Sequence, residues 1–79
     1  MKLREIVLGE SDERKRETIL NYTGRQVILK DEHYEWCHGT LQGEEEDYTD
    51  SYMLKIEDAI RERRLYYHDL QQLLIIRSK

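Results

Sequence analysis

The chain has 79 residues, 13 basic and 17 acidic side chains with a formal net charge of -4, and one cysteine, Cys37. A single cysteine excludes an intrachain disulfide and a thiolate metal cluster, and the longest apolar run, Leu73 to Ile76, is far too short for a membrane span. With 38% apolar residues, six tyrosines and one tryptophan, the composition predicts one folded domain over residues 1–79. We expect a cytoplasmic protein without a cofactor and without membrane association, because no signal-peptide segment precedes the domain.

Residues 11–23 predict a helix. Ser11 stands at the N-cap, acidic residues follow in the first turn, and Gly24 stands where a C-cap glycine is expected. The apolar residues gather at the C-terminal end, so only the last turn can pack on a core. The β-branched residues near that end leave a strand as the alternative. Residues 1–10 form either an arm or an extra strand.

Residues 24–77 alternate between short β-rich runs and polar turns. The expected order is two strands around the polar KDEH, an acidic loop in QGEEEDYTDS, a strand in SYMLKIEDA, a strand in RERRLYY, a turn in HDLQQ and a strand in LLIIR. The fold class is therefore mainly β with an N-terminal helix. Five short strands in so few residues predict a strongly bent sheet that closes into a small barrel, because closure removes exposed strand edges.

The last strand carries apolar side chains on both faces. A domain of this size cannot cover both faces by itself, so we expect a second copy of the chain against it. The predicted oligomer interface consists of Leu65, Leu73, Leu74, Ile75 and Ile76.

From roughly Arg16 to Arg77 the order of motifs resembles the Sm and Sm-like (LSm) family, which includes the RNA chaperone Hfq. The resemblance is carried by LNYTGRQVIL, HGTLQG, MLKIEDA and LYYHDLQQLLII. It implies a five-stranded, SH3-like barrel. It also implies a homo-oligomeric ring, a hexamer or heptamer, in which the fourth strand of one subunit pairs with the fifth of the next.

The resemblance further implies a non-enzymatic protein that binds single-stranded RNA or a nucleotide-like ligand at the inner rim of the ring. Tyrosine faces can stack on bases, and a histidine beside them can meet a phosphate or a base edge. By position, the binding residues are Asp50, Tyr52, Met53, Tyr67, His68 and Asp69. Arg63 is expected at the rim of this surface, and pairing of the neighbouring arginines with the acidic loop is the simpler alternative.

The departures from the family pattern favour a second interpretation. Met53 stands where Sm proteins usually carry an asparagine, and Tyr67 replaces the lysine of Hfq. The acidic run Glu44 to Asp47 repels phosphate. Acidic Sm-like proteins include the Rof type, which docks on the RNA-binding surface of a partner protein such as a transcription terminator, and negative charge can imitate nucleic acid to such a partner.

Catalytic and metal sites are not expected. The sequence shows no nucleophile with a base at a sensible spacing, and Cys37 and His38, as neighbours in a strand, point to opposite faces. By the same alternation, one of Tyr66 and Tyr67 is expected in the core or an interface and the other toward a ligand. His68 is either a turn histidine that bonds the nearby backbone or a ligand-facing residue.

Overall fold

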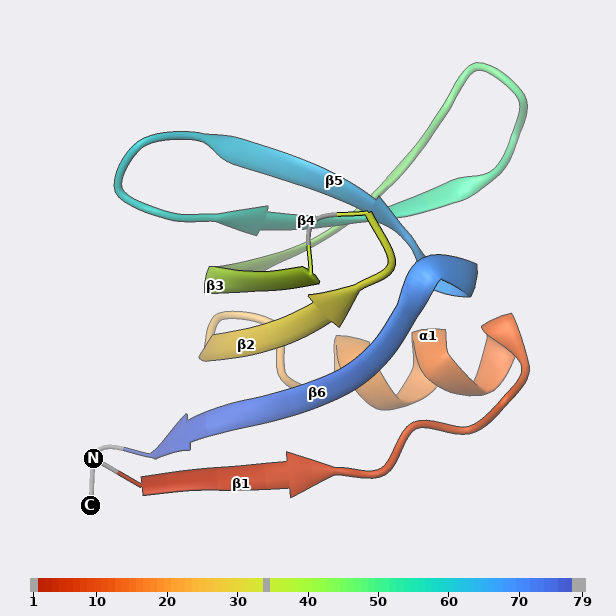
Figure 1. Ribbon diagram of the computed structural model, residues 1–79. Coiled ribbons are helices and arrows are strands. Elements are labelled where there is room, and N and C mark those ends of the chain that lie inside the picture. Colours follow the sequence, from red (N-terminus) through yellow and green to blue (C-terminus); the bar gives the residue numbers. More distant parts are fainter. Residues whose placement is uncertain (1, 34, 78–79) are drawn as a thin grey trace.

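The computed structural model describes residues 2–33 and 35–77, which form one helix and a six-stranded antiparallel sheet (Figure 1). The elements in chain order are β1 (Lys2–Ile6), α1 (Asp12–Leu20), β2 (Gln26–Asp31), β3 (Glu35–Glu46), β4 (Tyr52–Glu57), β5 (Glu62–Tyr66), the 3₁₀ turn η1 (Tyr67–Asp69) and β6 (Leu70–Arg77). The strand order in the sheet is β1-β6-β2-β3-β4-β5.

The expectation of a mainly β fold with an N-terminal helix is confirmed, but the five-stranded barrel is wrong. β1 is a sixth strand, which pairs with β6 from Lys2 opposite Arg77 to Ile6 opposite Leu73. β6 therefore has β1 on one edge and β2 on the other, and neither edge is left for β5. The sheet stays open, with β1 and β5 at its two ends.

The helix begins where its N-cap residue predicts it, but it ends at Leu20 with Asn21 as the C-cap, so the expected end at residue 23 before a Gly24 cap is wrong. The Ser11 hydroxyl accepts a hydrogen bond from the Arg14 amide at 3.2 Å, and Ile19 is the buried residue of α1. The chain then turns through Gly24, whose amide donates to the Leu41 carbonyl at 2.7 Å. Only the last turn of α1 packs on the core, and the first turn is left at the surface. With nine residues, α1 is too short to cross a membrane, and the described part of the chain contains no helix that is long and apolar enough to do so.

β3 is a long strand that pairs with β2 in its first half and with β4 in its second half. The register shifts between Leu41 and Gly43, and Gly43 has the positive φ of 122° that suits a bulge. The strand continues through Glu46, so the prediction of an acidic loop over QGEEEDYTDS is wrong except for Asp47 to Ser51. Backbone pairing with β4 holds these acidic residues in the strand. Arginines of other elements also bind them: the Arg64 Nε atom donates to Glu45 Oε2 at 2.5 Å.

The core is one cluster between the concave face of the bent sheet and the end of α1. Its buried members are Ile19, Val27, Leu29, Cys37, Leu41, Leu54, Ile56, Leu65, Tyr67, Leu70, Leu73 and Ile75. Three residues of the predicted oligomer interface, Leu65, Leu73 and Ile75, thus lie inside the chain's own core. The other two, Leu74 and Ile76, are half-buried on the opposite face of β6.

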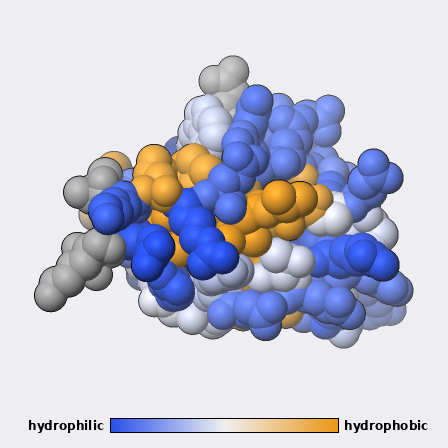
Figure 2. Space-filling view, turned by 90° about the horizontal axis from the view of Figure 1, so that it is seen from below, coloured by the Kyte–Doolittle hydropathy of each residue, from blue (hydrophilic) through white to orange (hydrophobic). Residues whose placement is uncertain are grey.

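Apolar side chains also reach the surface on the side of the molecule where β1 and α1 lie. Seen from below, hydrophobic side chains form a broken band between hydrophilic ones (Figure 2). Leu3, opposite Ile76 in the sheet, is 51% exposed, and Val7 just after β1 is 85% exposed. The role of this face and of β6 in an oligomer stays a prediction.

Candidate functional site

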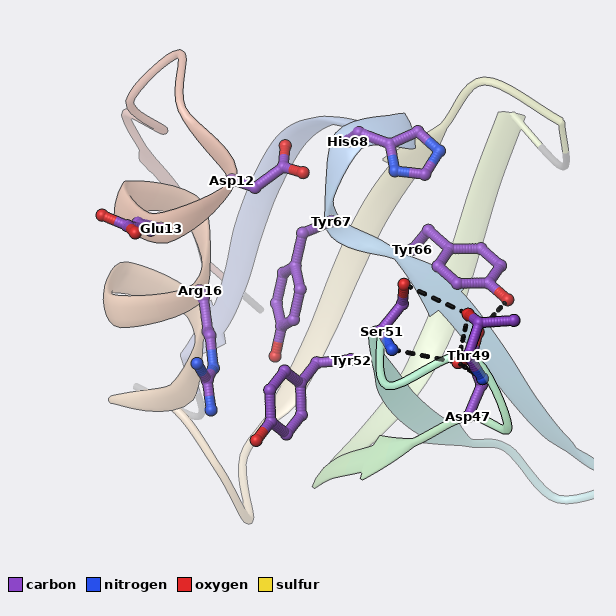
Figure 3. Close-up of a pocket in the computed structure, with 10 residues that line it drawn as sticks. All are labelled: Asp12, Glu13, Arg16, Asp47, Thr49, Ser51, Tyr52, Tyr66, Tyr67 and His68. Carbon is purple, nitrogen blue, oxygen red and sulfur yellow. Dashed lines mark hydrogen bonds between the residues drawn. The ribbon is translucent and has the colours of Figure 1, made fainter.

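A pocket of about 480 Å³ opens between the first turns of α1, the loop from β3 to β4, and the turn η1 (Figure 3). These three segments are far apart in the sequence. They meet here because β4 and β5 are paired in the sheet and α1 packs beside η1. The volume lies within the range of small-ligand pockets in proteins.

Arg16 of α1 lines the pocket and is held by two groups of the sheet. Its Nε and Nη2 atoms donate to the carboxylate of Glu44 on β3, at 2.9 Å to Oε2 and 2.5 Å to Oε1. Its guanidinium carbon lies 4.0 Å from the centre of the Tyr52 ring, which is a cation–π distance. The positive charge of Arg16 is therefore already matched within the chain.

Tyr67 forms the floor of the pocket. Its side chain is only 4% exposed, and its hydroxyl donates to Glu44 Oε2 at 2.7 Å. Burial first, and the hydrogen bond to Glu44 second, raise the pKa of Tyr67 well above its usual range. The hydrogen bonds from Arg16, and to a smaller extent from Tyr67, lower the pKa of Glu44. Arg16, Glu44 and Tyr67 thus form one hydrogen-bonded network. At neutral pH Glu44 is ionised and Tyr67 is protonated.

Asp47 organises the loop on the other side of the pocket. Its Oδ1 atom accepts hydrogen bonds from the Thr49 amide at 2.7 Å, the Thr49 hydroxyl at 2.7 Å and the Ser51 amide at 3.0 Å. Its Oδ2 atom accepts the Tyr66 hydroxyl at 2.7 Å. The Thr49 hydroxyl and then the Tyr66 hydroxyl contribute most to lowering the pKa of Asp47 to about 2. Asp47 thus stays ionised and fixes the loop rather than offering a free acceptor.

His68 stands at the rim of the pocket in η1. Its ring stacks on Tyr66, with ring centres 5.5 Å apart and planes inclined by 24°. Its Nε2 atom lies 3.4 Å from Oδ1 of the neighbouring Asp69. Oδ2 of Asp69 in turn lies 3.3 Å from Nε2 of His33, and Asp69 is only 7% exposed. His68 is therefore a turn residue with an exposed ring, and the buried Asp69 holds the turn.

The pocket unites some of the sequence-predicted binding residues and separates others. Tyr52, Tyr67 and His68 line it. Asp50 belongs to its loop without lining it, and Met53, the cross-strand neighbour of Tyr66, does not line it either. Asp69 lies inside η1, and Arg63 lies 3.9 Å from Asp58, away from the pocket.

Several pocket residues were not predicted from the sequence. Arg16 and its partner Glu44 are 28 positions apart, so no local pattern connects them. Asp47 was assigned only to a repulsive acidic loop. The alternation of Tyr66 and Tyr67, by contrast, is as expected, because Tyr67 is buried and Tyr66 is half-buried.

The chemistry of the pocket is acidic and aromatic. Its lining contains the carboxylates of Asp12, Glu13 and Asp47 and one guanidinium, that of Arg16, which Glu44 neutralises. Cys37 is buried and His38 is exposed, on opposite faces of β3, and no three metal-ligating side chains converge within residues 2–33 and 35–77.

In comparisons with protein-family models, curated proteins and solved structures, no match to the chain is found.

We expect Glu44→Gln to lower the stability of the domain at neutral pH and to flatten its acid dependence. The folded state lowers the pKa of Glu44, so its contribution is complete above the ordinary glutamate pKa and is lost as the pH falls through the folded value. Urea unfolding of wild type and variant should show a difference at neutral pH that shrinks toward pH 3. Glu46→Gln, at an exposed glutamate of the same strand, is the control. A difference that persists unchanged in acid would contradict this role for Glu44.

Proposed function

We propose that this chain is a non-enzymatic binding module that docks its acidic β3–β4 hairpin and pocket onto a basic surface of a protein that itself binds nucleic acid. The observation that carries the proposal is the charge of this end of the molecule. Asp12, Glu13, Glu46 and Asp50 make no ion pair within the described ranges, whereas the pocket's arginine is neutralised by Glu44. A net charge of -4 adds a general attraction for a basic partner.

The tip of the hairpin supports a protein as the partner. Tyr48 is 98% exposed there, beside Asp47 and close to Asp50. An exposed tyrosine is a typical anchor of protein interfaces, and acids around it can match a basic counterpart. This agrees with the Rof-like interpretation of the sequence. A phosphate backbone, by contrast, would approach carboxylates that have no ion-pair partner among the described residues.

A second candidate is the homo-oligomeric ring that binds single-stranded RNA. The stacked pair of Tyr66 and His68, together with Tyr52 at 40% exposure, favours it because such rings can stack on bases. The ring contact requires β5 of one subunit to pair with β6 of the next. Since β6 is paired with both β1 and β2, this ring also requires β1 to leave its place.

Two measurements test the proposed function. Light scattering gives the mass in solution, and fluorescence titration compares a short labelled peptide of alternating arginine and glycine with short A-rich and U-rich RNAs at low and moderate salt. We expect a monomer that binds the peptide in preference to the RNAs. A ring that binds RNA would establish the second candidate instead, and binding of neither probe would overturn both.

The acidic hairpin is tested by the double variant Glu46→Gln and Asp50→Asn. We expect it to weaken peptide binding about fivefold, the sum of two surface charge contacts. The control is Glu32→Gln with Glu10→Gln, which removes the same charge from exposed sites outside the hairpin. Equal weakening by both pairs would show attraction to net charge alone and contradict a docking surface at the hairpin.

A further inference from the structure

The pocket already contains one example of how its side chains hold a guanidinium. The guanidinium carbon of Arg16 lies over the Tyr52 ring, 4.0 Å from its centre, while two nitrogens of the same group donate to the carboxylate of Glu44. An aromatic face combined with a carboxylate in the guanidinium plane is the arrangement that suits arginine in particular. The same two kinds of group recur on the other side of Tyr67, where no internal arginine is placed.

The free carboxylate on that side is Asp12. It makes no hydrogen bond or ion pair with the described residues, and Figure 3 shows it pointing toward Tyr67 and His68. The other acids of the pocket differ from it. Asp47 uses both oxygens to hold its loop, and Glu13 points away from the other side chains drawn.

The aromatic surface beside Asp12 is the stacked pair of His68 and Tyr66. The stack and the Tyr66 hydroxyl bond to Asp47 fix these rings before any ligand arrives. The His68 side chain is 61% exposed, so its ring is open to a ligand that enters between α1 and η1. A ligand cation would therefore meet one free carboxylate and a fixed ring at the same place.

We propose that the pocket binds the guanidinium of an arginine side chain on the partner protein, with Asp12 accepting its N–H groups and the His68–Tyr66 stack covering its flat face. This inference rests on the proposed function and gives the docking surface a specific anchor. A lysine ammonium has neither the flat face nor the paired donors, so the pocket should discriminate against it. A citrulline side chain has the shape without the charge and should not bind.

The test uses blocked Gly-Gly-X-Gly-Gly peptides, in which X is arginine, lysine or citrulline, titrated into the full chain and followed by backbone amide NMR shifts. We expect saturable shifts at Asp12, Tyr66 and His68 with the arginine peptide, binding about threefold or more weaker with lysine, and none with citrulline. Asp12→Asn should weaken the arginine peptide about tenfold. Absence of shifts at these three amides, or equal binding of arginine and lysine, would overturn the inference.

Glu17→Gln is the matched control. It removes the same charge from the same helix, but from an exposed side chain that does not line the pocket. Its arginine affinity should stay within about twofold of wild type. Equal losses for Asp12→Asn and Glu17→Gln would show a general charge effect and overturn the pocket assignment. That outcome would not change the result expected for the hairpin variants Glu46→Gln and Asp50→Asn. The docking function is therefore tested independently of the arginine site.

Discussion

Ile75→Glu is expected to unfold the isolated chain. Ile75 is 1% exposed, lies opposite Val27 on β2 and belongs to the core cluster. A buried, unpaired carboxylate destabilises a protein by about 3 to 5 kcal/mol or more. The whole stability expected of a domain of this size is only roughly 4 to 12 kcal/mol. Circular dichroism and urea unfolding should show loss of the cooperative transition.

Ile76→Glu is the matched control, since it makes the same change one residue later. Ile76 is half-buried on the opposite face of β6, beside the exposed Leu3 of β1. We expect this variant to fold, with a loss of about 1 kcal/mol or less. If wild type is a ring and Ile75→Glu instead yields a folded monomer, Ile75 belongs to a subunit interface and not to the core.

The parts of the fold that were predicted from the sequence depend on local signals. Ser11 defines the start of α1 because an N-cap acts within a few residues. The expected glycine cap does not end the helix: α1 ends at Leu20 with Asn21 as C-cap, and Gly24, with its positive φ of 89°, belongs to the turn that follows. The alternation in β4, with Leu54 and Ile56 buried, likewise follows from residues two positions apart. These signals need no knowledge of the rest of the chain.

The sequence-based predictions are wrong where a contact with a residue far away in the sequence determines the local structure. The run of three glutamates after Gly43 predicted a loop, since charged runs are usually solvated, yet pairing with β4 and the ion pairs to Arg16 and Arg64 hold it in a strand. The composition of the pocket could not be predicted from the sequence for the same reason. Tyr52, Tyr67 and His68 were assigned by resemblance, but the acids and the arginine that set its charge come from segments that only the fold brings together.

Gly39→Ala is expected to disturb both the fold and the pocket. An added Cβ atom would lie 2.5 Å from the Glu57 carbonyl oxygen and 2.8 Å from its carbon, and both are backbone atoms of β4. Neither can move aside as a side chain does, so β3 and β4 must separate. Gly39 pairs with Val27 in an unshifted register, which places the β3 bulge farther along, near Gly43. Gly39 thus marks a close approach of two strands.

The expected loss of unfolding free energy for Gly39→Ala is on the order of 3 kcal/mol, the scale of overpacking in a well-packed interior. Gly24→Ala separates this steric effect from a backbone effect. Gly24 has φ of 89° and an added Cβ would meet nothing within 4 Å, so its loss should be about 1 kcal/mol, from the unfavourable φ alone. Because β3 carries Glu44 and leads into the Asp47 loop, Gly39→Ala should also shift the amide signals of Tyr67 and Ser51, whereas Gly24→Ala should not. Equal losses for the two variants would mean that β3 and β4 are less closely packed at Gly39 than described.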